Sequence, residues 1–185
     1  MNKLMTFIIV AMVFLAACDD EPSITYGAEQ TPIETFQNQL TFSSTTVDDA
    51  EYEYGCLFQV NKDGKITKLC ANQPKDGIYR VTLWDLSDSS VVVSAQVEVD
   101  SGQTSYTDIT DVDVKAGEKY SVSINSEHYY IYDDSPSNNI FPATVGDISV
   151  IGYGYILTPI GMQFYDEFYS DYIATLADVV YQPIE

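Results

Sequence analysis

The side chains that usually carry enzyme chemistry are sparse in this sequence. Its one histidine, His128, stands beside Glu127, and no Gly-x-Ser-x-Gly turn presents a serine nucleophile to it. The 28 Asp and Glu residues could supply two carboxyl groups for glycoside hydrolysis, but with so many acids a close pair arises by chance. We therefore expect His128 to be an exposed loop residue and the protein to be no enzyme, with a glycan hydrolase as the alternative left open.

Aromatic side chains in the last third of the chain could bind a ligand without catalysis. Tyrosine offers a flat apolar ring and a hydroxyl group, which suit stacking on sugars and adaptable protein contacts. The candidate binding residues are Tyr129, Tyr130, Tyr132, Tyr153 and Tyr155. The competing expectation is that about half of the aromatic residues here pack in the core, because alternate residues of a strand point to opposite faces.

Oxygen ligands gather around Pro136, in a loop that could hold a structural calcium ion. The ligands are Asp133, Asp134 and Asn138, with Asn139 next to them. Their spacing matches no defined calcium motif, so a solvated turn is the competing expectation. We expect no other cofactor.

Two cysteines, Cys56 and Cys70, flank the turn signal Asn61-Lys62-Asp63-Gly64. If that turn closes a hairpin, the two thiols come within bonding reach, and the sequence predicts a disulfide. Two free buried thiols are the alternative. A zinc site is disfavoured because His128 is the only histidine.

The first residues have the organisation of an export signal. Lys3 supplies a positive start, an apolar run follows from Leu4, and Leu15-Ala16-Ala17-Cys18 closes it. This segment resembles bacterial lipoprotein signals, which implies removal of residues 1–17 and acylation of Cys18. The run is too short to span a bilayer as a helix. An ordinary secretory signal is the alternative.

The acids Asp19, Asp20 and Glu21 follow Cys18 directly. An Asp at this place resembles an inner-membrane retention signal of enterobacterial lipoproteins, whereas an acidic cluster resembles the surface-export signal of Bacteroidetes-type lipoproteins. We expect the outer membrane or cell surface of a Gram-negative bacterium. With a formal net charge of −20 the chain repels phosphate, so we expect attachment to the lipid bilayer through acylated Cys18 and no binding to nucleic acid.

Period-two patterns dominate the chain after a polar N-terminal stretch. Residues 18–38 contain Pro and Gly among polar residues and predict a flexible acidic tether. Residues 39–185 predict one domain, an all-β, two-sheet antiparallel sandwich. The expected strands are Leu40–Thr46, Tyr54–Val60, Lys65–Ala71, Gly77–Leu86, Val91–Val99, Asp108–Val114, Lys119–Asn125, Asp147–Tyr155 and Ala174–Tyr181. Trp84 lies opposite the Tyr79, Val81 and Leu83 face, and we expect it to be structural.

From Tyr54 to Pro183 the chain resembles a bacterial domain family of unknown function found in secreted and surface proteins. The matching positions are Glu53, Gly55 and Phe58, Ile66 and Leu69, Leu83-Trp84-Asp85, Ala116-Gly117 with Tyr120, Phe141-Pro142, Tyr153-Gly154, and Asp178 to Tyr181. An aromatic pair expected before Asp178 is replaced by Thr175 and Leu176. The resemblance implies a jelly-roll-like sandwich in a glycan-related setting and carries no catalytic residues.

These observations together predict a surface lipoprotein that acts as a non-catalytic binding module for a glycan. A structural or adhesive subunit of a surface assembly, whose partner is a protein, is the alternative. An open sheet edge or a flat apolar patch would favour the assembly subunit.

Overall fold

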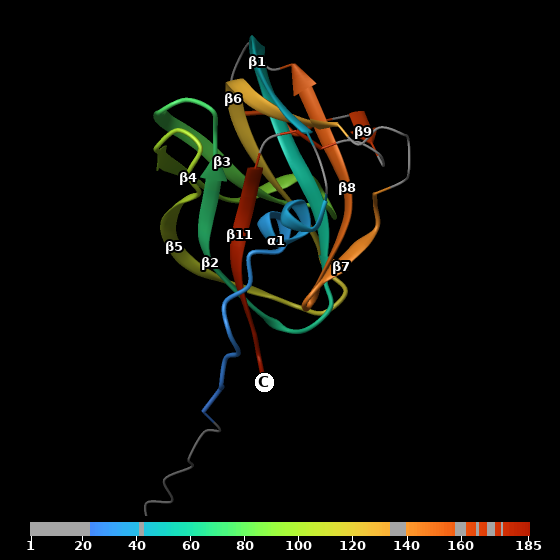
Figure 1. Ribbon diagram of the computed structural model, residues 1–185. Coiled ribbons are helices and arrows are strands. Elements are labelled where there is room, and N and C mark those ends of the chain that lie inside the picture. The colour runs from blue at the N-terminus through green and yellow to red at the C-terminus, as the bar shows by residue number, and fades with distance from the viewer. Residues whose placement is uncertain are drawn as a thin grey trace, which may run out of the picture.

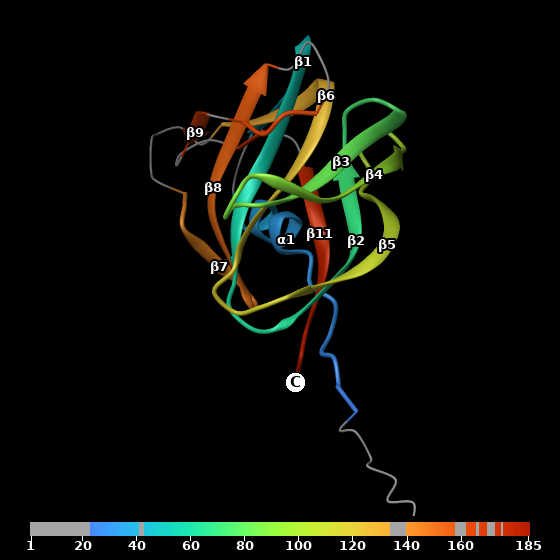
Figure 2. The same cartoon turned by 180° about the vertical axis from the view of Figure 1, so that it is seen from behind.

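The computed structural model is a sandwich of two antiparallel sheets, seen from opposite sides in Figures 1 and 2. It describes residues 23–40, 43–133, 140–157, 162–165, 167–169, 173–174 and 176–185. The large sheet has the order β4 (Ser90–Val99), β3 (Gly77–Asp85), β6 (Lys119–Asp133), β1 (Ser43–Val60), β8 (Ile148–Leu157) and β7 (Ala143–Val145), with β9 (Glu167–Tyr169) on β8 and β10 (Ile173–Ala174) on β6. The small sheet is β11 (Leu176–Pro183), β2 (Gly64–Asn72) and β5 (Ser105–Val114). The predicted all-β antiparallel sandwich is therefore confirmed.

The core lies between the two sheets and follows the alternation of the sequence. Phe58, Leu83 and Val122 project from the large sheet, while Leu69 and Val179 project from the small one, and all five are fully buried. Because successive strand residues point to opposite faces, their sequence neighbours form the outer faces of the sandwich.

Most predicted strands are present with bounds close to those expected, but two of them are joined. β1 runs continuously over Ser43–Val60 where two strands were predicted. Its pairing with β6 shifts register between Asp48 and Tyr52. That irregularity interrupts the alternating pattern and made one bent strand resemble two.

The expected hairpin at Asn61-Gly64 is wrong, because this turn carries the chain from the large sheet to the small one. The N–H of Asn61 donates to the carbonyl of Asp147, at 2.8 Å. Cys56 on β1 and Cys70 on β2 consequently belong to different sheets, and both are free, buried thiols rather than a disulfide. Burial raises the pKa of each thiol well above its usual value.

The flexible tether predicted up to residue 38 is wrong for its second half, which packs on the domain. The N–H of Gly27 donates to the carbonyl of Pro183 at 2.7 Å, and that of Gln30 to Tyr181 at 2.8 Å. The helix α1 (Pro32–Gln39) follows and buries Ile33 and Phe36 in the core. Pro32 is well suited to the first helical turn, where its missing N–H is not needed. Ile33 and Phe36 are three residues apart and therefore share one helix face, which packs on the core beside β11.

A buried carboxylate on β11 fixes the start of α1. Thr31, the residue at the N-cap, makes no side-chain cap, and the N–H of Glu34 donates instead to Asp178 Oδ2 at 2.8 Å. Asp178 is fully buried, and this burial raises its pKa to about 7. The N–H groups of Ile33, Glu34 and Val179 oppose that shift.

The two ends of the described chain lie at one pole of the sandwich. Residues 23–31 run beside the C-terminal strand, with bridges from Tyr26 to Ile184 and from Gln30 to Tyr181. The free ends of β1, β6 and β8 lie at the opposite pole (Figure 1). We call these the terminal pole and the distal pole. Within the described residues, no helix is both long enough and apolar enough to cross a membrane.

Candidate functional site

Five tyrosine rings contact one another where β1, β6 and β8 approach the distal pole. The ring of Tyr54 lies 4.7 Å from that of Tyr129, and Tyr52 meets Tyr155 edge-on at 5.9 Å. Tyr155 stacks on Tyr169 at 5.3 Å, with their hydroxyl oxygens 3.1 Å apart. We call Tyr52, Tyr54, Tyr129, Tyr155 and Tyr169 the tyrosine cluster.

The structure divides the five predicted binding tyrosines into two groups. Tyr153 is fully buried, and Tyr129 is nearly so, which makes both of them packing residues. Tyr155 is half-buried in the tyrosine cluster. Tyr130 and Tyr132 are also half-buried, with ring centroids 6.1 Å apart on the distal part of β6. Three of the five therefore keep surface that a ligand could touch.

Three members of the cluster, Tyr52, Tyr54 and Tyr169, are not among the predicted binding residues. Tyr52 and Tyr54 belong to β1, and the alternating pattern predicts a strand from Tyr54 onward but does not indicate which strands lie beside it. The register partners of Tyr52 and Tyr54 are Leu157 and Tyr155 on β8, more than a hundred residues along the chain. The local signals for this pole are therefore the tyrosine-rich segment 129–132 and the pair Tyr153 and Tyr155.

The predicted calcium ligands and the predicted lipidated cysteine lie outside this description. Asp134, Asn138 and Cys18 are not among the described residues, and for Asp133 only the backbone, at the end of β6, is described. Among the described residues, no group of three or more His, Cys, Asp or Glu side chains could hold a metal ion. Both assignments remain predictions.

His128 lies on β6, so the expectation of an exposed loop position is wrong. Its ring is half-buried, and Nδ1 lies 2.8 Å from Asp48 Oδ1 on β1. Asp48 also contacts the ammonium of Lys75 at 3.0 Å, and these partners lower its pKa, Lys75 first. This arrangement links the strand β1 to the loop before β3, and the side chain that contacts the imidazole is a carboxylate.

A second constellation lies on the outer face of the large sheet, where sequence analysis proposed no site. Glu53 on β1 is fully buried, and its two oxygens accept from Ser123 at 2.5 Å and from Arg80 at 2.7 Å. Trp84 donates its indole N–H to the same Ser123 hydroxyl at 2.7 Å. Burial raises the pKa of Glu53, while Ser123 and Arg80 act in the opposite direction.

This polar network is covered by Met162–Tyr165, a segment outside the helices and strands. Phe164 meets the Trp84 ring at 5.4 Å and 62°, and the Tyr165 hydroxyl hydrogen-bonds that of Ser121. Thr82 donates to the Met162 sulfur at 3.4 Å. Trp84 is thereby reduced to 4% exposure, which confirms the structural placement expected for it.

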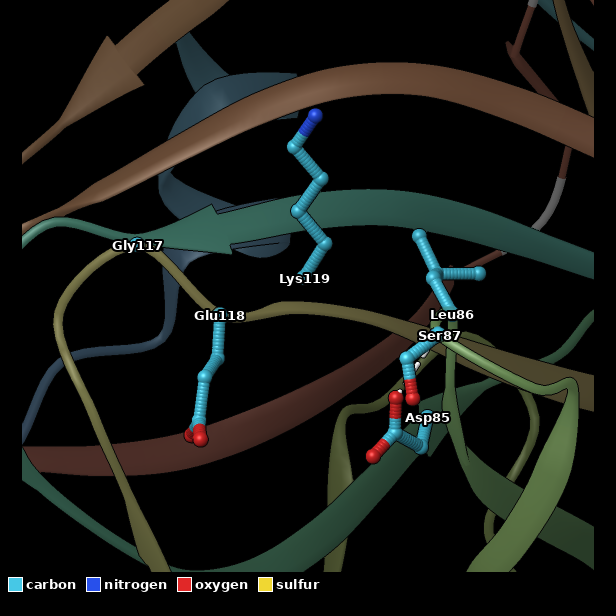
Figure 3. A pocket seen from close by; sticks show the side chains of 6 residues that line it. All are labelled: Asp85, Leu86, Ser87, Gly117, Glu118 and Lys119. Atoms are coloured by element: carbon cyan, nitrogen blue, oxygen red, sulfur yellow. Dashed lines mark hydrogen bonds between the residues drawn. The ribbon is translucent and has the colours of Figure 1, made fainter.

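Two open pockets lie at the ends of the β3–β6 pair. One, of about 290 Å³, is lined by Asp85, Leu86, Ser87, Gly117, Glu118 and Lys119. Figure 3 shows that Glu118 and Lys119 point in different directions there. The N–H of Ser87 donates a hydrogen bond to Asp85 Oδ1. Glu118 already accepts from Tyr120 and from the N–H of Lys115, so it is engaged in holding the turn.

The other pocket, of about 270 Å³, opens at the opposite end of the same strands. It is lined by Glu51, Ile78, Tyr79, Asn125, Ser126, Glu127 and His128. Asn125 is the register partner of Arg80, so this pocket adjoins the Glu53 network.

Comparison with known proteins adds no family assignment. The sequence matches none of the protein-family models, and no curated protein matches it significantly.

Proposed function

We propose that this protein is a lipid-anchored, non-catalytic binding module that holds a glycan at its distal pole. The observation that carries the proposal is the placement of half-buried tyrosines at the pole opposite to the chain ends (Figure 1). An anchor at Cys18 would turn the terminal pole towards the bilayer and the distal pole outward.

The chemistry of the distal pole supports a sugar ligand. Tyr130, Tyr132, Tyr155 and Tyr169 each keep part of the ring accessible. Sugar rings present C–H groups that stack on aromatic faces and hydroxyls that bond to phenols. The neighbouring rings hold each other in place, so little side-chain freedom is lost on binding.

A specific observation favours the alternative, an assembly subunit with a protein partner. β4 is the edge strand of the large sheet, and Val91 and Val92 at its start are exposed. Exposed apolar residues on an edge strand are typical of strand addition by a partner chain.

Binding of the purified full chain to a glycan array distinguishes the glycan-binding module from the assembly subunit. We expect saturable binding to one glycan class, weakened by Tyr130→Ala. The matched control is Tyr106→Ala, which removes a tyrosine that is 48% exposed on the small sheet. Absence of binding to every glycan would contradict the glycan proposal and favour the assembly subunit.

The anchor is tested separately, by labelling with a palmitate analogue in a Gram-negative host. We expect the label on the wild-type chain and its loss in Cys18→Ser, because only an acylated cysteine becomes the new N-terminus. Cys70→Ser, which changes a buried thiol, is the control and should keep the label. Persistent labelling of Cys18→Ser would contradict the anchor.

A further inference from the structure

The outer face of the large sheet is built from residues of the kind that face water, yet much of it is buried. On β4 this face is exposed through Ser94, Gln96 and Glu98. On the neighbouring strands it continues through fully buried polar residues, which are Thr82, Ser121, Ser123 and Glu53. Polar residues at solvent-facing strand positions predict contact with water or with a ligand, not with apolar side chains.

Among the described residues, the printed contacts over this face come from one short segment, Met162–Tyr165, which we call the strap. Its side chains reach Thr82 on β3, Trp84 on β3 and Ser121 on β6. The strap belongs to no helix or strand, so its own backbone adds little to the sheet. Its closure keeps the Glu53 carboxylate away from water, and burial of a charged group is costly unless it is well paired.

Two glycines lie on the strands beside the polar residues. Gly55 on β1 and Gly154 on β8 are register partners, so neither strand carries a side chain there. Gly55 also pairs with Ser123 on β6, at the centre of the network. A Cβ atom on Gly55 would lie 2.4 Å from the carbonyl oxygen of Val122 and 2.8 Å from Ser123, so glycine is needed here because β6 approaches the backbone closely. This close approach holds Ser123 next to Glu53.

The groups under the strap match those that hold a sugar ring. The Trp84 indole offers an aromatic face, Glu53 and Arg80 offer a charged acceptor and a charged donor, and the hydroxyls of Ser121 and Ser123 do both. Tyr165 already brings a ring and a hydroxyl to Ser121, as a ligand would. The open pocket lined by Asn125 and Tyr79 lies next to this face, because Asn125 is the register partner of Arg80.

We propose that Met162–Tyr165 is a displaceable strap, and that a saccharide displaces Tyr165 to bind the face formed by Glu53, Arg80, Trp84 and Ser123. This site is separate from the distal tyrosines and does not depend on them. The closed strap lowers the apparent affinity, because a ligand binds only the open fraction of molecules.

The only tryptophan in the chain lies under the strap and reports its opening. Acrylamide quenching of Trp84 is measured on the full chain, for wild type, Tyr165→Ala and Tyr106→Ala. Tyr106 is a 48% exposed tyrosine on the small sheet, so its variant is the matched control. Oligosaccharides of glucose, mannose, galactose and N-acetylglucosamine are then titrated against each protein.

We expect Tyr165→Ala to keep the β-sheet circular dichroism, to raise the quenching constant several-fold, and to bind at least one oligosaccharide about ten-fold more tightly than wild type. Bound sugar should shield Trp84 again. Tyr106→Ala should behave as wild type. A folded Tyr165→Ala whose tryptophan stays shielded, or becomes quenchable without binding any of the four, overturns the proposal.

If Tyr165→Ala does not fold, hydrogen exchange of the wild-type chain tests whether the strap opens. Exchange of the strap amides far faster than those of Thr82 to Trp84 supports displacement, and equal protection overturns it. Tyr130→Ala distinguishes the two proposals, since it should weaken binding at the distal pole and leave the strap site unchanged.

Discussion

Each sheet of the sandwich carries a buried carboxylate near its outer face, and the two are held in different ways. Asp178 on the small sheet lies under α1 and accepts main-chain N–H groups. Glu53 on the large sheet lies under the strap and is held by the side chains of Arg80 and Ser123. Main-chain donors belong to the fold and cannot turn away, whereas side-chain donors can exchange one acceptor for another. We therefore regard Asp178 as structural and the Glu53 network as available to a ligand.

The largest expected effect concerns Asp178 and pH. Its pKa is raised from 3.8 to about 7 in the folded protein, so the folded state holds this proton more tightly than the unfolded chain. Its contribution to stability is complete below pH 4 and is lost as pH rises to 7, by about 4 kcal/mol for a shift of this size. Glu34 faces the same carboxylate and adds to the rise.

Urea unfolding at a series of pH values measures this loss. Asp178→Asn should flatten the profile between pH 4 and 7, while Asp108→Asn, an exposed carboxylate on β5, should leave it as in wild type. If Asp178→Asn keeps the wild-type slope, Asp178 does not titrate as the structure indicates.

Removal of one partner of Glu53 should have the next effect. Arg80→Met leaves a buried carboxylate with one donor fewer, and we expect a loss of about 2 kcal/mol in the free energy of unfolding. Adding Glu53→Gln should recover most of it, because the buried charge is then gone. An additive loss in the double variant would show that the two side chains act independently.

Loss of a single hydroxyl from the strap should matter least. Tyr165→Phe removes the contact with Ser121 and should lower the unfolding free energy by about 1 kcal/mol, since a net hydrogen bond is worth this much. Ser121→Ala should cost a similar amount, and the double variant no more than either one. If the free energy of unfolding fell by several times this amount, the strap would be a fixed part of the fold, as α1 is.

The sequence predicted the strands well because alternation is a local signal. Tyr79, Val81 and Leu83 reveal the inward face of β3 without any knowledge of its neighbours. The turn at Gly64 was recognised as a change of direction, but a turn does not say which sheet the next strand joins. Pro32, Ile33 and Phe36 carry a helix signal that was read as part of a linker.

The site was harder to predict because its parts come together only in the fold. The tyrosine cluster joins β1, β6, β8 and β9, and of its members the sequence indicates Tyr129 and Tyr155, in the segments where tyrosines are close together. The polar positions of β3 and β6 that alternate with the core residues do not indicate what lies over them. Met162–Tyr165 covers these positions and lies about 80 residues after Thr82 in the chain. Such a distant contact cannot be predicted from the local sequence pattern.

Affinity for a glycan, compared between distal-pole variants, tests the central claim most directly. Isothermal titration of the full chain with the best ligand from the array is carried out for wild type, Tyr130→Ala and Tyr106→Ala. We predict a loss of about ten-fold or more in affinity for Tyr130→Ala, equal to about 1.4 kcal/mol, and no change for Tyr106→Ala. Equal affinities of all three proteins would contradict a glycan site at the distal pole.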